Sequence, residues 1–594
     1  MNITKSYKKV SNYTYLCRLI FNILFLINTN TLVYSQKTFL KIFNSGIEKL
    51  PENLNFKTQQ PDSISTYNTI KSVINQLTDK GYASVIIDSL IKTDNIFNVY
   101  LNLGHLYKWA NVSMDYKTRQ IFEESGCKTE KLSNNIFRYG DIKYLSEKVL
   151  TYLENNGYPL SSFYLDSIDF INPGNKINAI IKINKGPLIT IDSIYINKDA
   201  GISKSYIYSY IGIKPGDKYK EEKITGIDKK LKELDIIKLS SPTETIIRND
   251  KATIHINVQK GKVSDFTGII GFMPDNTDNK KLLINGEISL NLINILQYGE
   301  TVSINWRKTD PLSQQLKTSV EIPYIFNTHI GVDDKLNILK KDTTYLNINN
   351  RFGIKYMISY TDYCNAYYES KQSKLINTKG MKNISELPQY ADINTNYYGI
   401  EFYKEWFNYR NNPIKGYSFL VNLSTGMKKI KKNQNINPEV YNNIDLNTTQ
   451  YRIEEHASVF LPIGGKNTIG LFNKSGLLNG NGLFANELFR IGGFNTLRGF
   501  NEDAIYASAF SIFTCEYRYL LDEDSYIQIF CDGAYYETKT VNMIKYDTPY
   551  GLGIGITFST KAGMFSLNYA TGSEHGKPLN LNSFKIHFGI KGKL

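Results

Sequence analysis

The sequence predicts small α+β repeats followed by an all-β transmembrane barrel of about sixteen strands. Residues 36–262 alternate helical and strand-like segments, whereas residues 263–594 contain strand-like segments separated by turn residues. The chain also has 44 tyrosines and 30 phenylalanines, which suit pleated sheets and membrane boundaries. With 594 residues, it is long enough for several domains.

Residues 1–35 have the features of a secretory signal peptide. Basic residues up to Arg18 precede the apolar run at 19–27, and small and polar residues follow as far as Ser35. The apolar run is too short for a membrane-spanning helix. We therefore expect cleavage near Ser35 and export of the mature chain, with a buried N-terminal helix as the alternative.

Three cycles of helical and strand-like segments fill the exported N-terminal part. Their expected bounds are residues 36–104, 105–186 and 187–262. Apolar residues have helical spacing at 63–80, 140–156 and 220–234, and they alternate as in strands at 83–87, 176–183, 189–196 and 252–258. A repeat of roughly 75 residues is longer than that of helical solenoids and indicates small α+β modules.

The third cycle gives the order of elements within a module. One strand is followed by two helices, with a Lys-Pro-Gly-Asp turn at 214–217 between them, and then by two further strands. This order resembles the polypeptide-transport-associated (POTRA) domain. The resemblance implies sheet edges that an extended client segment can join by adding a strand. Modules that act only as spacers are the alternative.

The C-terminal part, residues 263–594, shows the alternation typical of a membrane barrel. Clear strand-like segments occur at 282–292, 300–306, 396–404 and 417–423. Near the end of the chain, apolar side chains at even positions of 549–558 alternate with Gly551, Gly553 and Gly555. A bilayer requires every backbone hydrogen bond to be closed, which strands achieve in a sealed barrel. We expect a long polar loop at 371–395; a soluble β-sandwich is the alternative.

Composition and motifs exclude several classes of function. The formal charge is +14, but basic residues are spread along the chain without a compact stripe or recognition motif, so we expect no nucleic-acid partner. The five cysteines form no CxxC pair and no metal-ligand spacing with the six histidines. A nucleophile elbow and a phosphate-binding loop are also missing from the sequence. We therefore expect no enzymatic activity, cofactor or metal.

One glycine-bracketed loop, residues 491–500, carries Arg498 between apolar neighbours. Glycine permits tight turns and close backbone approach, and an arginine offers five donors in a planar fork that matches carboxylates. A solvated surface charge is the alternative for a lone loop arginine.

The signal peptide, the three modules and a terminal barrel containing Leu497-Arg498-Gly499-Phe500 together resemble the BamA/TamA family of outer-membrane assembly factors. The resemblance implies that Arg498, Gly499 and Phe500 form a loop-locking motif. In this family the motif belongs to the sixth extracellular loop, which folds back into the barrel lumen. Its arginine is held there by acidic residues on the twelfth and thirteenth strands.

Mapped by motif, the acidic partners are Glu516 and Asp532. Strand alternation supports the same assignment, because Glu516 shares a face with Arg518, and Asp532 shares one with Gln528. The opposite faces carry apolar residues that suit lipid. We expect an arginine paired with both carboxylates in the lumen, where the pair is stronger than on a surface although desolvation offsets part of the gain.

Two positions depart from the family pattern. Ala534 stands where the thirteenth-strand motif usually has glycine, and the chain ends in Ile-Lys-Gly-Lys-Leu at 590–594 where a terminal aromatic residue is usual. A terminal strand signal for assembly would therefore use Phe584, Ile586 and Phe588.

The resemblance also implies a function and a location. We expect a protein of the bacterial outer membrane with its N-terminal modules in the periplasm, and three modules point to a TamA-like protein. Its expected partners are unfolded outer-membrane or secreted polypeptides, outer-membrane lipid, and periplasmic or inner-membrane assembly partners. Clients would insert at a lateral gate, where the first strand at 263–272 meets the last at 582–590. A two-partner-secretion transporter and a passive porin are the alternatives.

Overall fold

A computed structural model of the chain describes residues 37–594 except 129–134, 172, 275–281, 309–311, 410–411, 443, 523, 561–562, 580–583 and 594. The predicted signal peptide lies outside the described residues. The chain forms two compact units, Met1–Ile189 with Lys218–Glu221, and Thr190–Asp217 with Glu222–Leu594. None of the helices among the described residues is long and apolar enough to cross a membrane.

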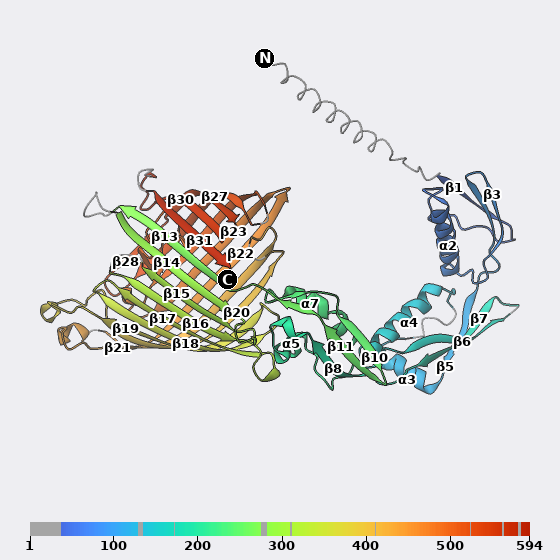
Figure 1. Cartoon of the computed structure of the whole chain (residues 1–594), viewed down its shortest axis with the longest axis horizontal. Helices are drawn as coiled ribbons and strands as arrows, with labels where there is room; N and C mark the ends of the chain where they lie inside the picture. Colours follow the sequence, from blue (N-terminus) through green and yellow to red (C-terminus); the bar gives the residue numbers. More distant parts are fainter. Residues whose placement is uncertain are drawn as a thin grey trace, which may run out of the picture. The chain divides into compact units, whose positions relative to one another are not determined.

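The first N-terminal sheet has four strands in the order β2-β1-β4-β3, and one helix packs against it (Figure 1). Its elements are β1 (Thr38–Asn44), β2 (Gln59–Gln60), α2 (Ser63–Asp79), β3 (Ile86–Thr93) and β4 (Ile96–Asn102). Asp62 caps the N-terminus of helix α2, because its side chain accepts a hydrogen bond from the Ser65 amide at 2.7 Å. The helix buries Val73 and Leu77 against the sheet. The predicted helix is confirmed, whereas the strand predicted at 83–87 starts later, at Ile86.

The second sheet has the order β5-β7-β6 and carries two helices. Its elements are β5 (Lys108–Met114), α3 (Tyr116–Glu124), α4 (Tyr139–Glu154), β6 (Ser162–Ile171) and β7 (Lys176–Asn184). Trp109, Val149 and Ile181 lie in the core between helices and sheet, where all three are fully buried. The helical spacing predicted at 140–156 therefore marks the buried face of α4.

The third sheet has the order β10-β11-β8. Its elements are β8 (Thr190–Ile196), η1 (Lys198–Ala200), α5 (Lys204–Ile211), α6 (Glu221–Thr225), α7 (Ile227–Glu233), β10 (Glu244–Arg248) and β11 (Lys251–Ile256), and the short strands β9 (Ile237–Leu239) and β12 (Val258–Lys260) pair beside it. The single helix predicted at 220–234 is wrong in one respect, because the helix is interrupted at Gly226. Glycine lowers helix propensity, which favours the break at this position.

All three sheets share one topology. In each, the first strand runs parallel to the last, and the strand before the last runs antiparallel to it. Strands β3, β6 and β10 therefore lie at sheet edges. The N-terminal part consists of POTRA-like α/β sheets, and the module boundaries at 104, 186 and 262 stay predictions.

A closed antiparallel barrel of sixteen strands, counted among the described residues, follows the sheets (Figure 1). The first eleven strands are β13 (Asp265–Pro274), β14 (Leu282–Ile293), β15 (Thr301–Lys308), β16 (Gln314–Ile322), β17 (Ile330–Lys341), β18 (Tyr345–Met357), β19 (Tyr363–Leu375), β20 (Asp392–Phe407), β21 (Gly416–Lys431), β22 (Asn447–Gly464) and β23 (Asn467–Gly480). The last five are β26 (Ala509–Leu520), β27 (Tyr526–Lys539), β28 (Ile544–Asp547) with β29 (Tyr550–Thr560), β30 (Gly563–Ser573) and β31 (Lys585–Lys593). The predicted fold class and strand number are confirmed.

Strands β28 and β29 count as one barrel strand. Both pair with β27: strand β28 pairs with the last residues of β27, and strand β29 pairs with the first residues of β27. Pro549, which has no backbone N–H to donate to a ladder, lies just before β29. The Ala534 amide instead donates to the Pro549 carbonyl at 2.9 Å. The interruption therefore leaves the barrel wall continuous.

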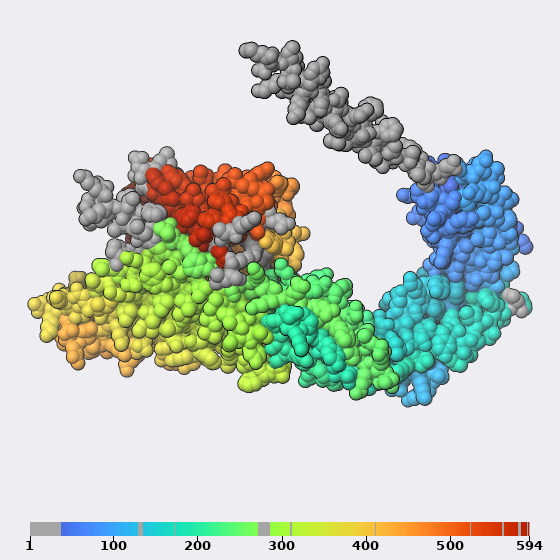
Figure 2. Space-filling view, viewed as in Figure 1, coloured from blue at the N-terminus to red at the C-terminus, as the bar shows by residue number. Residues whose placement is uncertain are grey.

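The first and last barrel strands, β13 and β31, meet at a paired seam. Eight pairs of residues face each other, from Asp265 opposite Lys593 to Phe272 opposite Ile586. In Figure 2 the red strands at the end of the chain lie beside the green strands that begin the barrel. The neighbouring contact between β30 and β31 has seven such pairs, so the seam is no shorter than its neighbour.

The loop predicted at 371–395 is shorter than expected. Strand β19 continues to Leu375 and β20 begins at Asp392, so residues 376–391 form the loop. The polar side chains that suggested a loop belong to the strand ends, where they alternate with outward-facing residues. Polar residues are compatible with a strand that lines a barrel interior.

Within the second compact unit, the module of the third sheet contacts turns at one end of the barrel. The Ser203 amide donates to the Gln297 carbonyl at 2.7 Å, and Tyr206 contacts Tyr324 edge to face at 5.2 Å between ring centroids. A Cβ atom at Gly299 would lie 2.1 Å from the Tyr206 ring, so this turn requires glycine. Burial raises the pKa of Tyr324, which keeps its hydroxyl protonated at this contact.

Candidate functional site

The segment that contains Arg498 connects β23 to β26 and lies inside the barrel. We call residues 481–508 the inner loop. It includes η5 (Ala485–Glu487) and two short strands that pair with each other, β24 (Phe489–Ile491) and β25 (Ile505–Ala507). Leu497 and Arg498 are almost completely buried, at 0% and 7% exposure. The loop is therefore packed into the lumen, where its side chains meet those of the barrel wall.

Three glycines close to Arg498 give this part of the inner loop its turns. Gly492, Gly493 and Gly499 have φ angles of 112°, 97° and 90°, which side chains other than glycine rarely adopt. Gly499 also lies against β30, because a Cβ atom there would be 2.4 Å from the carbonyl carbon of Thr571. Conformation and space both require glycine directly after the arginine.

Arg498 binds both acidic residues that were assigned to it. Its Nε donates to Asp532 Oδ2 at 2.8 Å, and its Nη2 donates to Asp532 Oδ1 at 2.6 Å. Its Nη1 donates to Glu516 Oε1 at 2.7 Å, and its backbone amide donates to Asp532 Oδ2 at 3.0 Å. Glu516 lies on β26, the twelfth strand, and Asp532 on β27, the thirteenth. The guanidinium thus forms a bidentate pair with one carboxylate and a single bond to the other.

Neighbouring side chains hold the two carboxylates in place. The Thr514 hydroxyl donates to Asp532 Oδ1 at 2.8 Å, and Arg518 Nη2 donates to Glu516 Oε2 at 2.6 Å. The Arg498 guanidinium lies 3.5 Å from the centre of the Phe530 ring, within cation–π range. Because Asp532 is 0% exposed, this charge cluster is shielded from bulk water.

The motif also packs on the last strands of the barrel. A Cβ atom at Gly551 of β29 would lie 2.1 Å from the Arg498 carbonyl oxygen, and one at Gly572 of β30 would lie 2.5 Å from the Phe500 ring. The glycine-rich face of β29 therefore leaves room for the loop backbone. Arg498, Gly499 and Phe500 together contact β26, β27, β29 and β30.

The residues assigned to a terminal strand signal lie at the start of β31. Phe584 precedes the strand, and Ile586 and Phe588 lie on its outward face, each partly exposed. His587, between them, points into the barrel and is buried. This arrangement gives the strand an apolar outer face, and the role of these residues in assembly stays a prediction.

Sequence reasoning missed a second buried attachment of the inner loop. Glu487 Oε1 accepts from Lys428 Nζ at 2.7 Å, and its Oε2 accepts from Gln450 Nε2 at 2.7 Å. The neighbouring Asn486 donates to the Ser373 hydroxyl and to the Ala391 carbonyl. These partners lie on β19, β21 and β22 and in the loop before β20, far away along the chain, so no spacing in the sequence could have indicated them.

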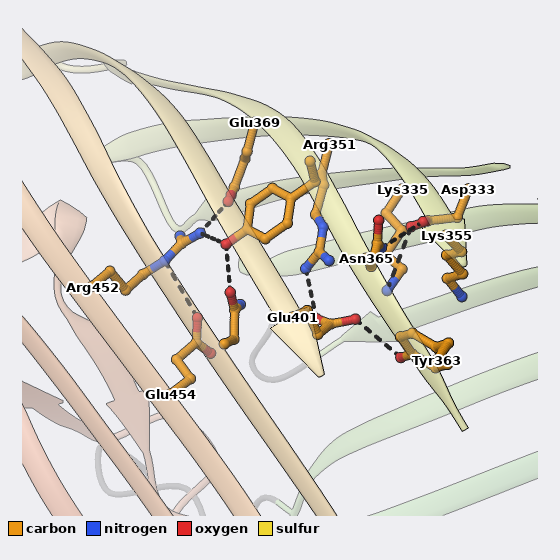
Figure 3. Close-up of polar contacts among 12 residues, drawn as sticks. Asp333, Lys335, Arg351, Lys355, Tyr363, Asn365, Glu369, Glu401, Arg452 and Glu454 are labelled. Carbon is orange, nitrogen blue, oxygen red and sulfur yellow. Dashed lines mark hydrogen bonds and ion pairs between the residues drawn. The ribbon is translucent and has the colours of Figure 1, made fainter. Parts of the chain in front are cut away.

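Further ion pairs join lumen-facing side chains of β18 to β22 (Figure 3). Arg351 of β18 donates to Glu401 of β20 at 2.9 Å, and Tyr363 donates to the same carboxylate at 3.0 Å. Arg452 of β22 binds Glu369 of β19. A cavity of about 500 Å³ lies beside these residues, bounded by Arg490 and Asp503 of the inner loop. The lumen is thus polar and water-accessible, yet crossed by the loop.

One cluster of possible metal ligands occurs among the described residues. Ligand atoms of Asp547, Glu574 and His575 lie within 4.8 Å of one another. His575 already bonds Asp547, with 3.2 Å between Nδ1 and Oδ2, so its imidazole has a protein partner. These three residues therefore do not identify a metal-binding site.

A closed sixteen-strand barrel, a lumen-folded arginine loop and N-terminal α/β sheets define a β-barrel protein of the bacterial outer membrane with periplasmic N-terminal domains. The chain belongs to the Omp85 superfamily, because the Omp85 superfamily domain matches residues 279–592, more than half of its length. Proteins of this superfamily are non-enzymatic barrels for assembly or transport. No curated protein sequence matches the chain.

Solved structures that resemble the chain include two of CdiB and one of BamA. CdiB from Acinetobacter baumannii is 12% identical with a TM-score of 0.53, and CdiB from Escherichia coli is 10% identical with a TM-score of 0.52; each match covers 89% of this chain and 98% of that chain. BamA from Haemophilus ducreyi lacking POTRA domains 1–3 is 14% identical with a TM-score of 0.45, covering 82% of this chain and 100% of that chain. At these identities, the CdiB matches support the fold alone.

Proposed function

We propose that this protein is a TamA-like outer-membrane assembly factor, which receives unfolded outer-membrane or secreted polypeptides in the periplasm and helps them into the membrane or across it. The observation that carries the proposal is the set of three open N-terminal sheets, in which β3, β6 and β10 are edge strands. An extended client can add a strand to such an edge through main-chain hydrogen bonds.

The edge strands offer apolar contacts as well as backbone groups. Ile86 and Ile91 of β3 are exposed, as are Ile168 and Phe170 of β6. Alternate side chains of a client strand would pack on these residues, and exposed apolar side chains on an open edge are otherwise an aggregation hazard. The edges therefore suit transient binding of unfolded chains.

The seam between β13 and β31 is the proposed gate. Its eight facing residue pairs are antiparallel and can be exchanged for pairing with a client strand, because ladder bonds depend on the backbone and not on side-chain identity. Arg498 and its two carboxylate partners, Glu516 and Asp532, keep the inner loop bound in the lumen while the seam opens and closes.

The proposal is tested by depleting the protein and measuring the abundance of outer-membrane proteins, followed by complementation with R498A. Depletion should lower the abundance of several barrel proteins, and R498A should fail to restore them. Unchanged outer-membrane protein levels in both cases would remove the assembly role.

A two-partner-secretion-type transporter is the second candidate, because such a transporter would share the sixteen-strand barrel and the lumen-folded arginine loop. Every α-helix of the described residues falls between Ser63 and Glu233, so the described part offers no helix threaded through the lumen. In the depletion experiment, a transporter would leave barrel proteins unchanged and remove a secreted polypeptide from the medium.

A passive porin is less well supported. A porin needs an open channel along its axis, whereas the inner loop crosses the lumen here and is bound to its wall through Glu487 and Arg498. Steady open-channel conductance of the wild-type protein in lipid bilayers would favour the porin.

A further inference from the structure

The inner loop has another ionic contact, with a strand near the start of the barrel. Arg307 of β15 lies 3.2 Å from Glu502 through Nη1 and Oε2, and 2.8 Å from Asp503 through Nη2 and Oδ2. All three side chains are only 13–14% exposed. Solvent and salt screen such a largely buried group weakly, so one guanidinium binds two loop carboxylates firmly.

The loop holds these carboxylates in position for Arg307. The Phe494 amide donates to Glu502 Oε1 at 2.7 Å, and Gly493 lies so close that a Cβ atom there would be 2.1 Å from the Glu502 carboxyl carbon. Arg490 of the same loop lies 3.6 Å from Asp503. The acceptor geometry is therefore set mainly within the loop, which makes the site a preformed receptor for the arginine.

The same part of the loop reaches the last strand of the barrel. The Phe494 ring lies 5.6 Å from that of His587, a buried residue of β31 that points into the lumen. A continuous series of contacts therefore runs from His587 through Phe494 and Glu502 to Arg307. One end of this series lies on β31 and the other on β15.

The series spans the seam. The order of strands around this part of the barrel is β31-β13-β14-β15, and the seam lies between β31 and β13. Arg498 and Gly499 attach the loop to β26, β27 and β30 on the β31 side. Moving β13 away from β31 would carry β15 with it and pull Arg307 from the loop.

We infer that Glu502 and Asp503 are positioning residues that bind Arg307 across the seam and hold β13 to β15 against β31. The seam opens when this pair separates, while Arg498 keeps the rest of the loop seated. The inference depends on the barrel and the loop, and it holds for an assembly factor and for a transporter alike.

The test measures opening of the full-length protein in planar lipid bilayers. R307Q should raise the frequency of open-channel events about tenfold or more, since losing one partner of a buried charge pair shifts an equilibrium at least that far. The conservative variant R307K, which keeps the positive charge beside Glu502 and Asp503, should hold the frequency closer to that of the wild type.

K317Q is the matched control. Lys317 lies on the neighbouring β16 and lines the same cavity. All residues of the inner loop are described, and none of them binds Lys317 through a hydrogen bond or an ion pair. The variant removes the same formal charge from the lumen and leaves the direct contacts of Arg307 with Glu502 and Asp503 in place, although Lys317 lies close enough to feel the charges of Arg307 and Asp503. It should keep the wild-type opening frequency.

Two results would overturn the inference. One is an R307Q protein that opens no more often than the wild type, and the other is an equal increase in K317Q, which would assign the effect to lumen charge. If R307Q fails to fold, E502Q/D503N provides the test, because it keeps the side-chain size and Arg307 while removing the carboxylate charges. Its folded state is checked by heat-modifiable migration in gels.

Discussion

Arg498 is the cation that binds the buried carboxylate of Asp532 directly. Without its guanidinium, Asp532 retains Thr514 as a side-chain partner and Glu516 retains Arg518. A buried carboxylate that loses its cation is destabilising, because its desolvation is no longer offset. The arginine therefore stabilises the loop and the strands together.

The first prediction concerns this guanidinium. R498A should lower the free energy of unfolding of the barrel by about 3–5 kcal/mol, and R498K should lower it less, because lysine keeps the charge and loses the bidentate fork. Urea unfolding of the purified protein measures both. K466A, at an exposed turn, is the control; an equal loss in that variant would contradict the assignment.

The second prediction concerns the space beside Gly499. G499A should unseat the inner loop, because its Cβ atom would lie 2.4 Å from the Thr571 carbonyl carbon, a backbone atom that cannot move aside cheaply. Limited proteolysis within residues 481–508 measures the unseating. Gly464 has a similarly positive φ of 105° with nothing near its Cβ position, so G464A controls for backbone strain. Equal protection in both variants would show that the steric contact is unimportant.

At the residue scale, the sequence was most informative where a motif and strand alternation agreed. Arg498, Glu516 and Asp532 are brought together as that combination suggested. Glu487 and Glu502 could not be foreseen, because each is one of 56 acidic residues and its partner lies on a distant strand. Only the folded barrel brings those partners near.

At the scale of elements, alternation located strands better than it located their ends. The segments predicted at 282–292 and 300–306 correspond closely to β14 and β15. Strand β20, predicted at 396–404, extends from Asp392 to Phe407, because polar residues at its ends still suit the lumen or the headgroup region. Barrel strands therefore continue beyond the hydrophobic segment that marks them.

The third prediction tests the register of two neighbouring strands. Cys515 of β26 and Cys531 of β27 are direct partners on the outward face, and both are free thiols. Directly opposed residues have Cα atoms about 4.5–5.5 Å apart, which lies within the disulfide range. Mild oxidation of the folded protein in detergent should therefore join these two cysteines.

Mass spectrometry after trypsin measures the joined peptides, because Arg518 separates the two cysteines in sequence. Protein oxidised in urea should instead give mixed pairs that include Cys364. Predominant links to Cys364 in the folded protein would show that the register is wrong.

At the scale of the whole molecule, the order of modules and barrel was predictable from the change in periodicity near residue 262. The pairing of distant parts was not. The inner loop binds β15, β18, β19, β21, β22, β26, β27, β29 and β30, which lie up to 196 residues away from their loop partners. Periodicity reports only which face a residue occupies, not which strand it meets across a lumen.

The fourth prediction concerns the proposed gate. Ile270 and Phe588 are partners across the seam, so I270C/F588C in a background without other cysteines should form a disulfide that blocks client assembly. Cells should then contain fewer outer-membrane barrels, and a reducing agent should restore them. Immunoblotting of membrane fractions measures both effects.

The control pair is Ile288 and Trp306, which are direct partners on β14 and β15 away from the seam. I288C/W306C should form its disulfide without affecting assembly. Normal assembly with the seam disulfide formed would contradict lateral opening.

Two of the attachments of the inner loop, at Arg498 and at Glu502, also imply an order of folding. Arg498 and Asp532 are 34 residues apart in sequence, whereas Arg307 and Glu502 are 195 apart. Closing the longer segment costs about 1.5 kcal/mol more chain entropy, so the local contact forms more readily. We expect the C-terminal strands to gather around the loop first. The first barrel strands would then fold onto a loop that is already in place. The loop would serve as the surface on which the barrel closes.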